Sequence, residues 1–241
     1  MASITKQTNN SIDINVQQVF SAIQETLQNL KKLNIIIAGK TGVGKSTLIN
    51  AVFREKMAET GIGRPVTMHM CKIEKTDIPL SIYDTRGLEL SKDVQNEVKK
   101  EIVDIINKGY KDENERIHCI WYCVNTAGNK IEPAEIEWLR ELSKENKNYQ
   151  VPIIIILTQS FSKNKAEELR KAILNENLDV VQVVPVLAED INIDDQYLVE
   201  SFGLDNLVRV TSEVLSSDLN DTFQYVQIAS LEEKKDMHRR L

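Results

Sequence analysis

The sequence has no apolar run long enough to cross a membrane. Its longest run, residues 152–157, has the length of a strand, whereas a spanning helix needs about 18 apolar residues or more. Residues 1–10 are polar and contain no apolar core of the kind that a secretory signal carries. We therefore expect a cytoplasmic protein without a transmembrane segment.

Cysteine is scarce, with three residues among 241. An odd count without a secretory signal predicts free thiols in a reducing compartment. Cys119 and Cys123 lie four residues apart in a predicted strand, so they share one face. A metal site is the alternative, but no matching Cys or His pair occurs elsewhere in the sequence, so the pattern favours core cysteines.

An excess of positive charge is also missing. The 30 basic and 36 acidic residues give a net charge of −6, which argues against broad non-specific binding of nucleic acids. Repeats, low-complexity tracts and dividing linkers are absent, and 241 residues are enough for one α/β domain with a substantial core.

What the sequence does contain is a phosphate-binding motif. Residues 39–46 read Gly-Lys-Thr-Gly-Val-Gly-Lys-Ser and fit the pattern GxxxxGK[ST] at every fixed position. A β-branched run at 34–38 precedes it, and apolar residues at helical spacing follow it up to about residue 55. The strand before and the helix after are the context that the motif requires, which makes a chance match a poor explanation.

The chemistry of this loop follows from its residues. Glycines let the backbone curl around phosphates with its N–H groups inward, and the following helix adds its own free N–H groups. Lys45 can reach the β- and γ-phosphates and Ser46 can ligate Mg²⁺. We expect the Lys40 side chain to face solvent. The predicted nucleotide-binding residues of the loop are Gly39, Lys40, Thr41, Gly42, Val43, Gly44, Lys45, Ser46 and Thr47.

Strands and helices alternate along the rest of the chain. Strands are predicted at 34–38, 68–75, 79–83, 117–124, 151–157 and 180–186, and helices at 16–33, 46–55, 93–110, 132–145, 165–174, 203–216 and from 218 onward. This order predicts an α/β fold with a mostly parallel sheet between helical layers. The hairpin 68–75/79–83, turning at Thr76-Asp77, would add one antiparallel edge strand. Residues 56–67 are predicted to be a loop, since Gly61, Gly63 and Pro65 break regular structure.

A second motif, Asp84-Thr85-Arg86-Gly87, follows the strand at 79–83. A carboxylate at the end of this strand can hold Mg²⁺, usually through water, and Gly87 lets a backbone N–H approach the γ-phosphate. The alternative is an ordinary turn residue at a strand end. Between the two motifs, Thr67 can ligate Mg²⁺ and order its loop in the triphosphate state, or it may only begin the next strand.

With these motifs in this order, residues 33–216 resemble the small GTPases of the translation-factor-related class. They are most similar to the Era/TrmE/septin-like branch and its bacterial Era-like proteins with an Asp-Thr-Arg-Gly motif. The resemblance implies a three-layer Ras-like P-loop fold, GTP or GDP with Mg²⁺, and switch segments at 57–67 and 85–92. It also implies that the Ala188 backbone contacts the oxygen of the base.

We expect three parts along the chain. These are a flexible N-terminus at 1–14, a GTP-binding domain with its N-terminal helix at 15–217, and a C-terminal helix at 218–241. Whether the chain is a truncated or a stand-alone protein is left open.

The base-reading motif departs from the family pattern. Thr158 fits, but Gln159 replaces the lysine that packs over the base, and Phe161 stands where an aspartate pairs with guanine. Gln159 can still lie along the base, and Phe161 can stack on it or serve in the core or a lid. The preference for guanine over adenine therefore stays open.

The catalytic machinery also departs from that pattern. Leu88 occupies the place of the water-orienting glutamine, so hydrolysis must be slow or depend on another group or a partner. The predicted catalytic residues are Lys45, Thr67, Arg86 and Gly87, and the predicted metal ligands are Ser46, Thr67 and Asp84. Arg64 and Arg86 can each stabilise charge, in cis or across a dimer, or simply be solvated.

Three hypotheses follow. The first is a Mg²⁺-dependent GTPase switch with slow hydrolysis, served by an activator protein or a nucleotide-dependent homodimer. The second is a non-catalytic module whose assembly depends on the bound nucleotide. The third is an ATP-using P-loop protein, which the missing aspartate leaves open.

Overall fold

The computed structural model describes residues 30–53, 62–75, 78–86, 88, 91–128, 130–193 and 197–227. The chain divides into two compact units, residues 1–31 and 32–241, and the fold belongs to the second unit. The predicted N-terminal segment 1–14, nearly all of the predicted helix 16–33, the Thr76-Asp77 turn and the C-terminal tail from 228 lie outside the described residues.

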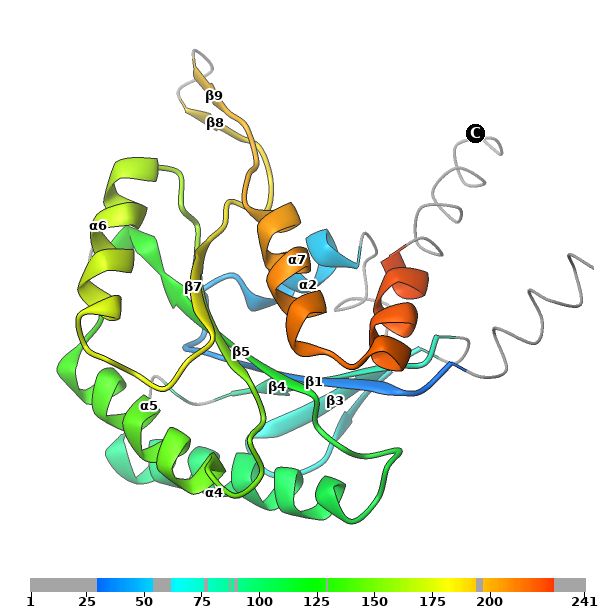
Figure 1. The fold of residues 1–241 in the computed structure, drawn as a ribbon. Helices are drawn as coiled ribbons and strands as arrows, with labels where there is room; N and C mark the ends of the chain where they lie inside the picture. The colour runs from blue at the N-terminus through cyan, green and yellow to red at the C-terminus, as the bar shows by residue number, and fades with distance from the viewer. Residues whose placement is uncertain are drawn as a thin grey trace, which may run out of the picture. The chain divides into compact units, whose positions relative to one another are not determined.

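Seven strands form the main sheet of the second unit (Figure 1). Their order across the sheet is β2 (Ile62–Pro65), β3 (Met70–Glu74), β4 (Leu80–Thr85), β1 (Leu33–Ala38), β5 (Cys119–Asn125), β6 (Ile153–Thr158) and β7 (Gln182–Pro185). The strands from β4 to β7 pair in parallel, and β3 pairs antiparallel with both of its neighbours. One strand of the described sheet therefore runs against the rest.

Helices cover both faces of this sheet. Figure 1 shows α4 (Lys92–Tyr110), α5 (Pro133–Asn146) and α6 (Lys163–Leu174) on one side, and α2 (Lys45–Val52), α7 (Leu204–Val214) and the helical residues 217–227 on the other. A short 3₁₀ turn, η1 (Thr126–Gly128), follows β5. This three-layer arrangement confirms the predicted fold class, that of a P-loop protein.

The two layers of core follow from the alternation of side chains along each strand. In β1, Ile36 packs toward α4 and α5, whereas Ile35 and Ile37 pack toward α2 and α7. Because both faces are covered, β1 and β6 are buried along their whole length. A continuous apolar run is typical of such strands.

The edge of the sheet differs from the prediction. Residues 62–65, predicted as part of a loop, form β2 and pair with β3, so the reversed strand is not at the edge. Gly63 and Pro65 do not prevent this pairing, because an outermost strand tolerates proline and glycine. A second hairpin, β8 (Ile191–Ile193) with β9 (Tyr197–Val199), was not predicted. Leu33, the predicted last residue of the N-terminal helix, instead begins β1.

Cys119 and Cys123 lie in the core, as the sequence pattern favoured. Cys119 and Cys123 are fully buried on the face of the sheet that α2 and α7 cover, and Cys71 is half-buried. All three are free thiols. In the part of the chain that the structure describes, no three Cys, His or acidic side chains are grouped as a metal site.

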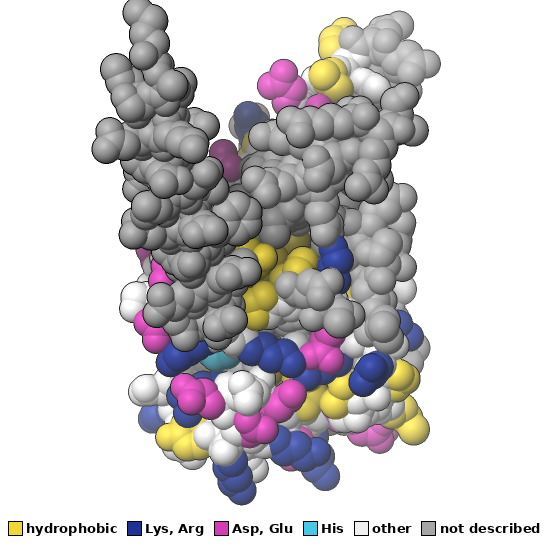
Figure 2. All heavy atoms as spheres, turned by 90° about the vertical axis from the view of Figure 1, so that its right-hand side faces the viewer, with side chains coloured by type: hydrophobic (Ala, Val, Ile, Leu, Met, Phe, Trp, Pro, Cys, Tyr) yellow, Lys and Arg dark blue, Asp and Glu magenta, His cyan; other side chains and the backbone are white. Residues whose placement is uncertain are grey.

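One face of the molecule carries charges of both signs. Figure 2 shows Lys and Arg side chains interspersed with Asp and Glu side chains on the described part of one face. Among the helices that the structure describes, none combines the length and the apolar character needed to cross a membrane.

Candidate functional site

The phosphate loop joins the end of β1 to the start of α2. Gly39, Gly42 and Gly44 have φ values of 143°, 79° and 97°, which side-chain-bearing residues rarely adopt. A Cβ on Gly39 would lie 2.6 Å from the carbonyl oxygen of Cys123. The loop is therefore seated directly against β5, and only glycine fits at its first position.

Lys45 points back into this loop. Its Nζ donates to the carbonyl oxygens of Gly39 at 2.8 Å and Lys40 at 3.2 Å, and only 9% of its side chain is exposed. The same Nζ lies 3.8 Å from Asp84 Oδ1. Two residues that the motifs predicted to act together, Lys45 and Asp84, are thus adjacent in space.

Asp84 stands near the end of β4, paired in register with Ile37 of β1. Burial raises the pKa of its carboxyl group, against the opposing charges of Lys45 and Arg86. Its Oδ1 is buried and accepts no hydrogen bond from the described residues. Apart from the Lys45 ammonium at 3.8 Å, this oxygen has no partner among the described residues, which fits an Mg²⁺ site of few protein ligands.

Ser46 is the second residue of α2 and is exposed, as a side chain facing a ligand would be. Its hydroxyl and the Asp84 carboxylate are the hard oxygen donors that Mg²⁺ prefers. The residues present therefore fit this ion. Thr41 and Thr47 complete the loop, exposed and half-buried respectively.

Thr67 takes a different position. It lies in the loop between β2 and β3, and its hydroxyl donates to the carboxylate of Glu101 on α4. Glu101 also accepts a hydrogen bond from the backbone N–H of His69 at 3.1 Å. The structure thus directs Thr67 toward α4 rather than toward Ser46 and Asp84, and its role as a metal ligand stays a prediction.

The second switch segment is described only in part. Arg86 is exposed, and its backbone N–H donates to the carbonyl oxygen of His69 at 2.8 Å, which extends the β3–β4 ladder. Gly87 lies outside the described residues. Leu88 is 3% exposed and packs in the core with residues of α4. Arg64 is exposed on β2.

Lys40 does not simply face solvent, contrary to the prediction. Its Nζ lies 3.3 Å from Glu132 Oε2 and 3.1 Å from Glu135 Oε2, and 30% of the side chain is exposed. Burial lowers the pKa of Lys40, but the two carboxylates outweigh it and raise the pKa overall. No pattern in the sequence indicates these ion pairs, because 92 or more residues separate the partners.

The base side of the site is formed by the ends of β6 and β7. The Thr158 hydroxyl donates to the carbonyl oxygen of Val43 at 2.6 Å, which ties β6 to the phosphate loop. Gln159 has a φ of 53°, and its Nε2 donates to the carbonyl oxygen of Gly42 at 3.0 Å. Gln159 therefore lies across the phosphate loop, as the lysine of the family pattern would.

A cavity of about 130 Å³ opens beside these residues. It is lined by Gly44, Thr47, Leu48, Thr158, Gln159, Val186, Leu187, Ala188, Glu189, Asp190 and Ile191. The predicted base-site residues Thr158, Gln159 and Ala188 are thus brought together. Phe161 does not line this cavity; it is 41% exposed and borders a separate cavity of about 20 Å³. A core role for Phe161 is excluded by that exposure.

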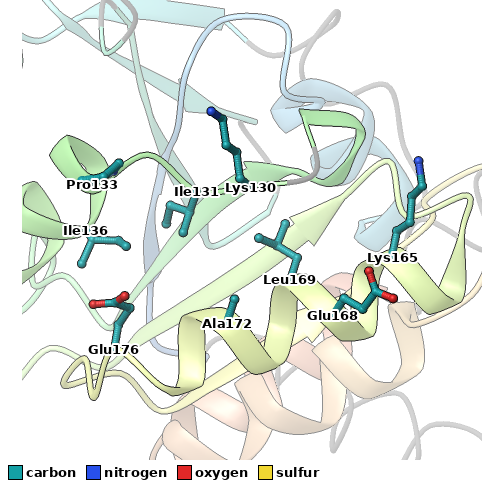
Figure 3. A pocket seen from close by; sticks show the side chains of 9 residues that line it. All are labelled: Lys130, Ile131, Pro133, Ile136, Lys165, Glu168, Leu169, Ala172 and Glu176. Atoms are coloured by element: carbon teal, nitrogen blue, oxygen red, sulfur yellow. The ribbon is translucent and has the colours of Figure 1, made fainter.

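A further hollow of about 420 Å³ lies between α5 and α6, away from the phosphate loop (Figure 3). Its apolar floor includes Ile131, Ile136 and Leu169. In Figure 3, the Lys130 and Lys165 side chains extend to the same side of this floor. Lys165 also borders the small cavity at Phe161, so the hollow adjoins the base loop.

Comparisons with known proteins find GTPases and septins among the proteins similar to this chain. The sequence profile described as 50S ribosome-binding GTPase matches residues 34–159. Human septin-12 is 25% identical over 194 residues, which are 69% of this chain and 53% of septin-12. Mouse septin-9 is 27% identical over 138 residues, which are 47% of this chain and 24% of septin-9. The chain therefore spans about half or less of the length of these relatives.

One solved structure supports the fold alone. A structure of the chloroplast translocon components atToc33 and psToc159, for which dimerisation is reported as important for GTPase activity, matches with a TM-score of 0.51 at 18% identity. The match covers 82% of this chain and 92% of that one.

Proposed function

The chain belongs to the family of 50S ribosome-binding GTPases, and from this premise we propose that it is a Mg²⁺-dependent molecular switch that hydrolyses GTP slowly to GDP. The observation that carries the proposal is the contact between the phosphate loop and the second motif, where Lys45 Nζ lies 3.8 Å from a buried Asp84 oxygen that accepts no hydrogen bond from the described residues. Within the family, the Asp-Thr-Arg-Gly sequence supports an Era-like assignment, and we propose a cytoplasmic location.

Each residue of the loop has a task in this proposal. The backbone of Gly39–Ser46 binds the phosphates, and Lys45 exchanges its hydrogen bonds to the Gly39 and Lys40 carbonyls for phosphate oxygens. Ser46 and Asp84 would hold Mg²⁺, Asp84 through a water, with Thr67 joining them when its loop moves. Mg²⁺, when bound, neutralises charge on the β- and γ-phosphate oxygens.

The reaction is the attack of water on the γ-phosphorus. A new P–O bond forms, the bond to the β,γ-bridging oxygen breaks, and GDP leaves with that electron pair while the water proton passes to phosphate. Leu88 is buried and apolar, so it cannot orient the water. Slow turnover without a partner is the expected result. The exposed Arg86, or an arginine from an activator or a second copy, would supply the charge that speeds the reaction.

A second candidate function is nucleotide-dependent assembly without hydrolysis. The burial of Leu88 favours it, because the residue at the place of the water-orienting glutamine is apolar and packed in the core. In that case the bound nucleotide would control a homodimer or another complex. An ATP-using protein remains a third, weaker candidate, since Phe161 does not reach the base cavity.

Single-turnover release of labelled phosphate from GTP tests the proposal. We expect slow release with Mg²⁺, strong suppression by chelation of Mg²⁺, and none for Lys45→Ala or Asp84→Asn. Lys171→Ala on the exposed side of α6 is the matched control and should behave as the wild type. Tight GTP binding without release, alone or at high protein concentration, would favour the assembly function instead.

A further inference from the structure

The base cavity contains two carboxylates that the family pattern does not assign. The cavity is lined by Glu189 and Asp190, directly after Ala188, while Phe161 at the position of the pattern's aspartate lies outside it. Among the described residues, the acidic side chains that line this cavity are these two. Among the residues that the structure describes, a carboxylate that recognises the base in this cavity therefore comes from this loop.

The guanine edge that carries O6, N1–H and the N2 amino group is recognised well by a carboxylate. Guanine presents one acceptor, O6, beside two donors, N1–H and the N2 amino group. An ionised carboxylate has two acceptor oxygens and can bind both donors at once. Gln159 is less suitable, because its Nε2 is a donor already used by the carbonyl oxygen of Gly42 at 3.0 Å.

The two acids differ in what they already bind. Asp190 Oδ1 accepts a hydrogen bond from the backbone N–H of Ser201 at 2.7 Å, and this bond lowers the pKa of Asp190. Asp190 therefore closes the base of the β8–β9 hairpin. Glu189 is exposed and has no ion pair or hydrogen bond within the part of the chain that the structure describes. Its carboxylate is available to a ligand.

The order along the chain matches the order of atoms on the base. The backbone N–H of Ala188, which is expected to bind O6, has no hydrogen-bond partner among the described residues. N1–H is the atom group next to O6 on the guanine edge, and Glu189 is the residue next to Ala188. One short loop can thus present a donor and a carboxylate to adjacent atoms of the same edge.

We propose that Glu189 is the specificity-determining residue of this site, and that its carboxylate binds the N1–H and N2 amino groups of guanine in place of the missing aspartate. This inference rests on the proposed binding of guanine nucleotide. It assigns to the loop after β7 a task that the loop after β6 performs in the family pattern.

Xanthine nucleotide provides a sharp test, because xanthine carries an oxygen where guanine carries its N2 amino group. A glutamine at position 189 would accept from N1–H and donate to that oxygen. We would titrate fluorescent GDP and compete it with XDP and ADP, using wild type, Glu189→Gln and Glu189→Ala. We expect Glu189→Gln to weaken GDP binding about tenfold or more and to strengthen XDP binding, since hydrogen bonds to a charged group are the strong ones.

Glu200→Gln is the matched control, because it changes an exposed acid that follows the β8–β9 hairpin and does not line the base cavity. It should leave the ratio of GDP to XDP affinity unchanged. An unchanged ratio in Glu189→Gln, with wild-type GDP binding intact, would overturn the inference. Failure of the wild type to bind GDP at all would instead overturn the proposed function.

Discussion

The hydroxyl of Thr67 donates a hydrogen bond to the carboxylate of Glu101, which joins the first switch segment to the middle of α4. The same carboxylate accepts from the His69 backbone N–H at 3.1 Å, and the His69 ring Nδ1 lies 3.1 Å from Glu101 Oε1. One glutamate thus holds both sides of the loop at residues 66–69. We expect this contact to compete with the arrangement of Thr67 that a bound triphosphate needs.

Replacement of Glu101 by glutamine should therefore favour the triphosphate. Loss of a charged hydrogen-bond acceptor is worth about 1.5 kcal/mol or more, so the ratio of affinities for a non-hydrolysable GTP analogue and GDP should rise about tenfold. Fluorescence titration of both nucleotides measures this ratio. Glu97→Gln, one turn earlier and exposed, is the control. An unchanged ratio in Glu101→Gln would mean that the contact does not restrain Thr67.

The first glycine of the phosphate loop should be the least replaceable. Gly39→Ala would place a Cβ 2.6 Å from the Cys123 carbonyl oxygen, at a φ of 143°. We expect a loss of about 2–4 kcal/mol in the free energy of unfolding, from steric overlap together with backbone strain. Urea denaturation measures it. Gly42→Ala is the control, because its φ is also positive but nothing lies within 4 Å of its Cβ. Equal losses for the two variants would contradict the close contact with β5.

Acid should lower the free energy of unfolding by protonating Glu74, the last residue of β3. Burial raises the pKa of this carboxyl, but hydrogen bonds from Lys32, Ser81 and Lys72 outweigh it and lower the pKa from 4.5 to about 2. Because the folded-state pKa is the lower one, the contribution to stability is present above pH 4.5 and is lost as the pH falls toward 2. Since the side chain is 33% exposed, solvent screening reduces the contribution to about 1 kcal/mol.

Chemical denaturation at pH 6 and at pH 3 tests this linkage. Because pH 3 lies between the two pKa values, the difference in unfolding free energy between pH 6 and pH 3 should shrink in Glu74→Gln by about half of this contribution, about 0.5 kcal/mol. Glu168→Gln, an exposed acid on α6, should leave the difference as in the wild type. An equal decrease of this difference in both variants would show that the hydrogen bonds of Glu74 do not cause the pH dependence.

The cysteines should divide into one reactive and two protected thiols. Burial raises the pKa of the Cys123 thiol to about 12 and raises that of Cys119 further. A buried thiol with a raised pKa carries little of the reactive thiolate. Titration with a thiol reagent should therefore detect about one thiol, Cys71, in the native protein and three after denaturation. Rapid reaction of all three would contradict the packing of β5 against α2.

The fold was largely predictable because its signals are local. The phosphate motif, the apolar run of β6 and the helical spacing of α4 each lie within one short segment, and each element appears where the pattern indicated. β2 was missed because its pairing with β3, not its own composition, makes it a strand. The β8–β9 hairpin was missed for the same reason.

The site was predictable only where the chain carries a motif. Gly39, Lys45 and Asp84 meet as the motifs require. Glu101 and Glu189 carry no such pattern, and their importance follows from contacts and cavities that form only when distant segments pack together. Phe161 was predicted to stack on the base or to serve in the core or a lid, and its exposure in the folded protein excludes the core role.

Competition between GDP and ADP for the nucleotide-free protein, with Mg²⁺ present, tests the proposed function most directly. A bound fluorescent GDP would be displaced by each unlabelled nucleotide in turn. We predict that GDP displaces it at concentrations at least a hundredfold lower than ADP, because the loop at Ala188 and Glu189 offers the donor and the acceptor that the guanine edge requires. Equal displacement by the two nucleotides, or stronger displacement by ADP, would contradict a guanine-nucleotide switch.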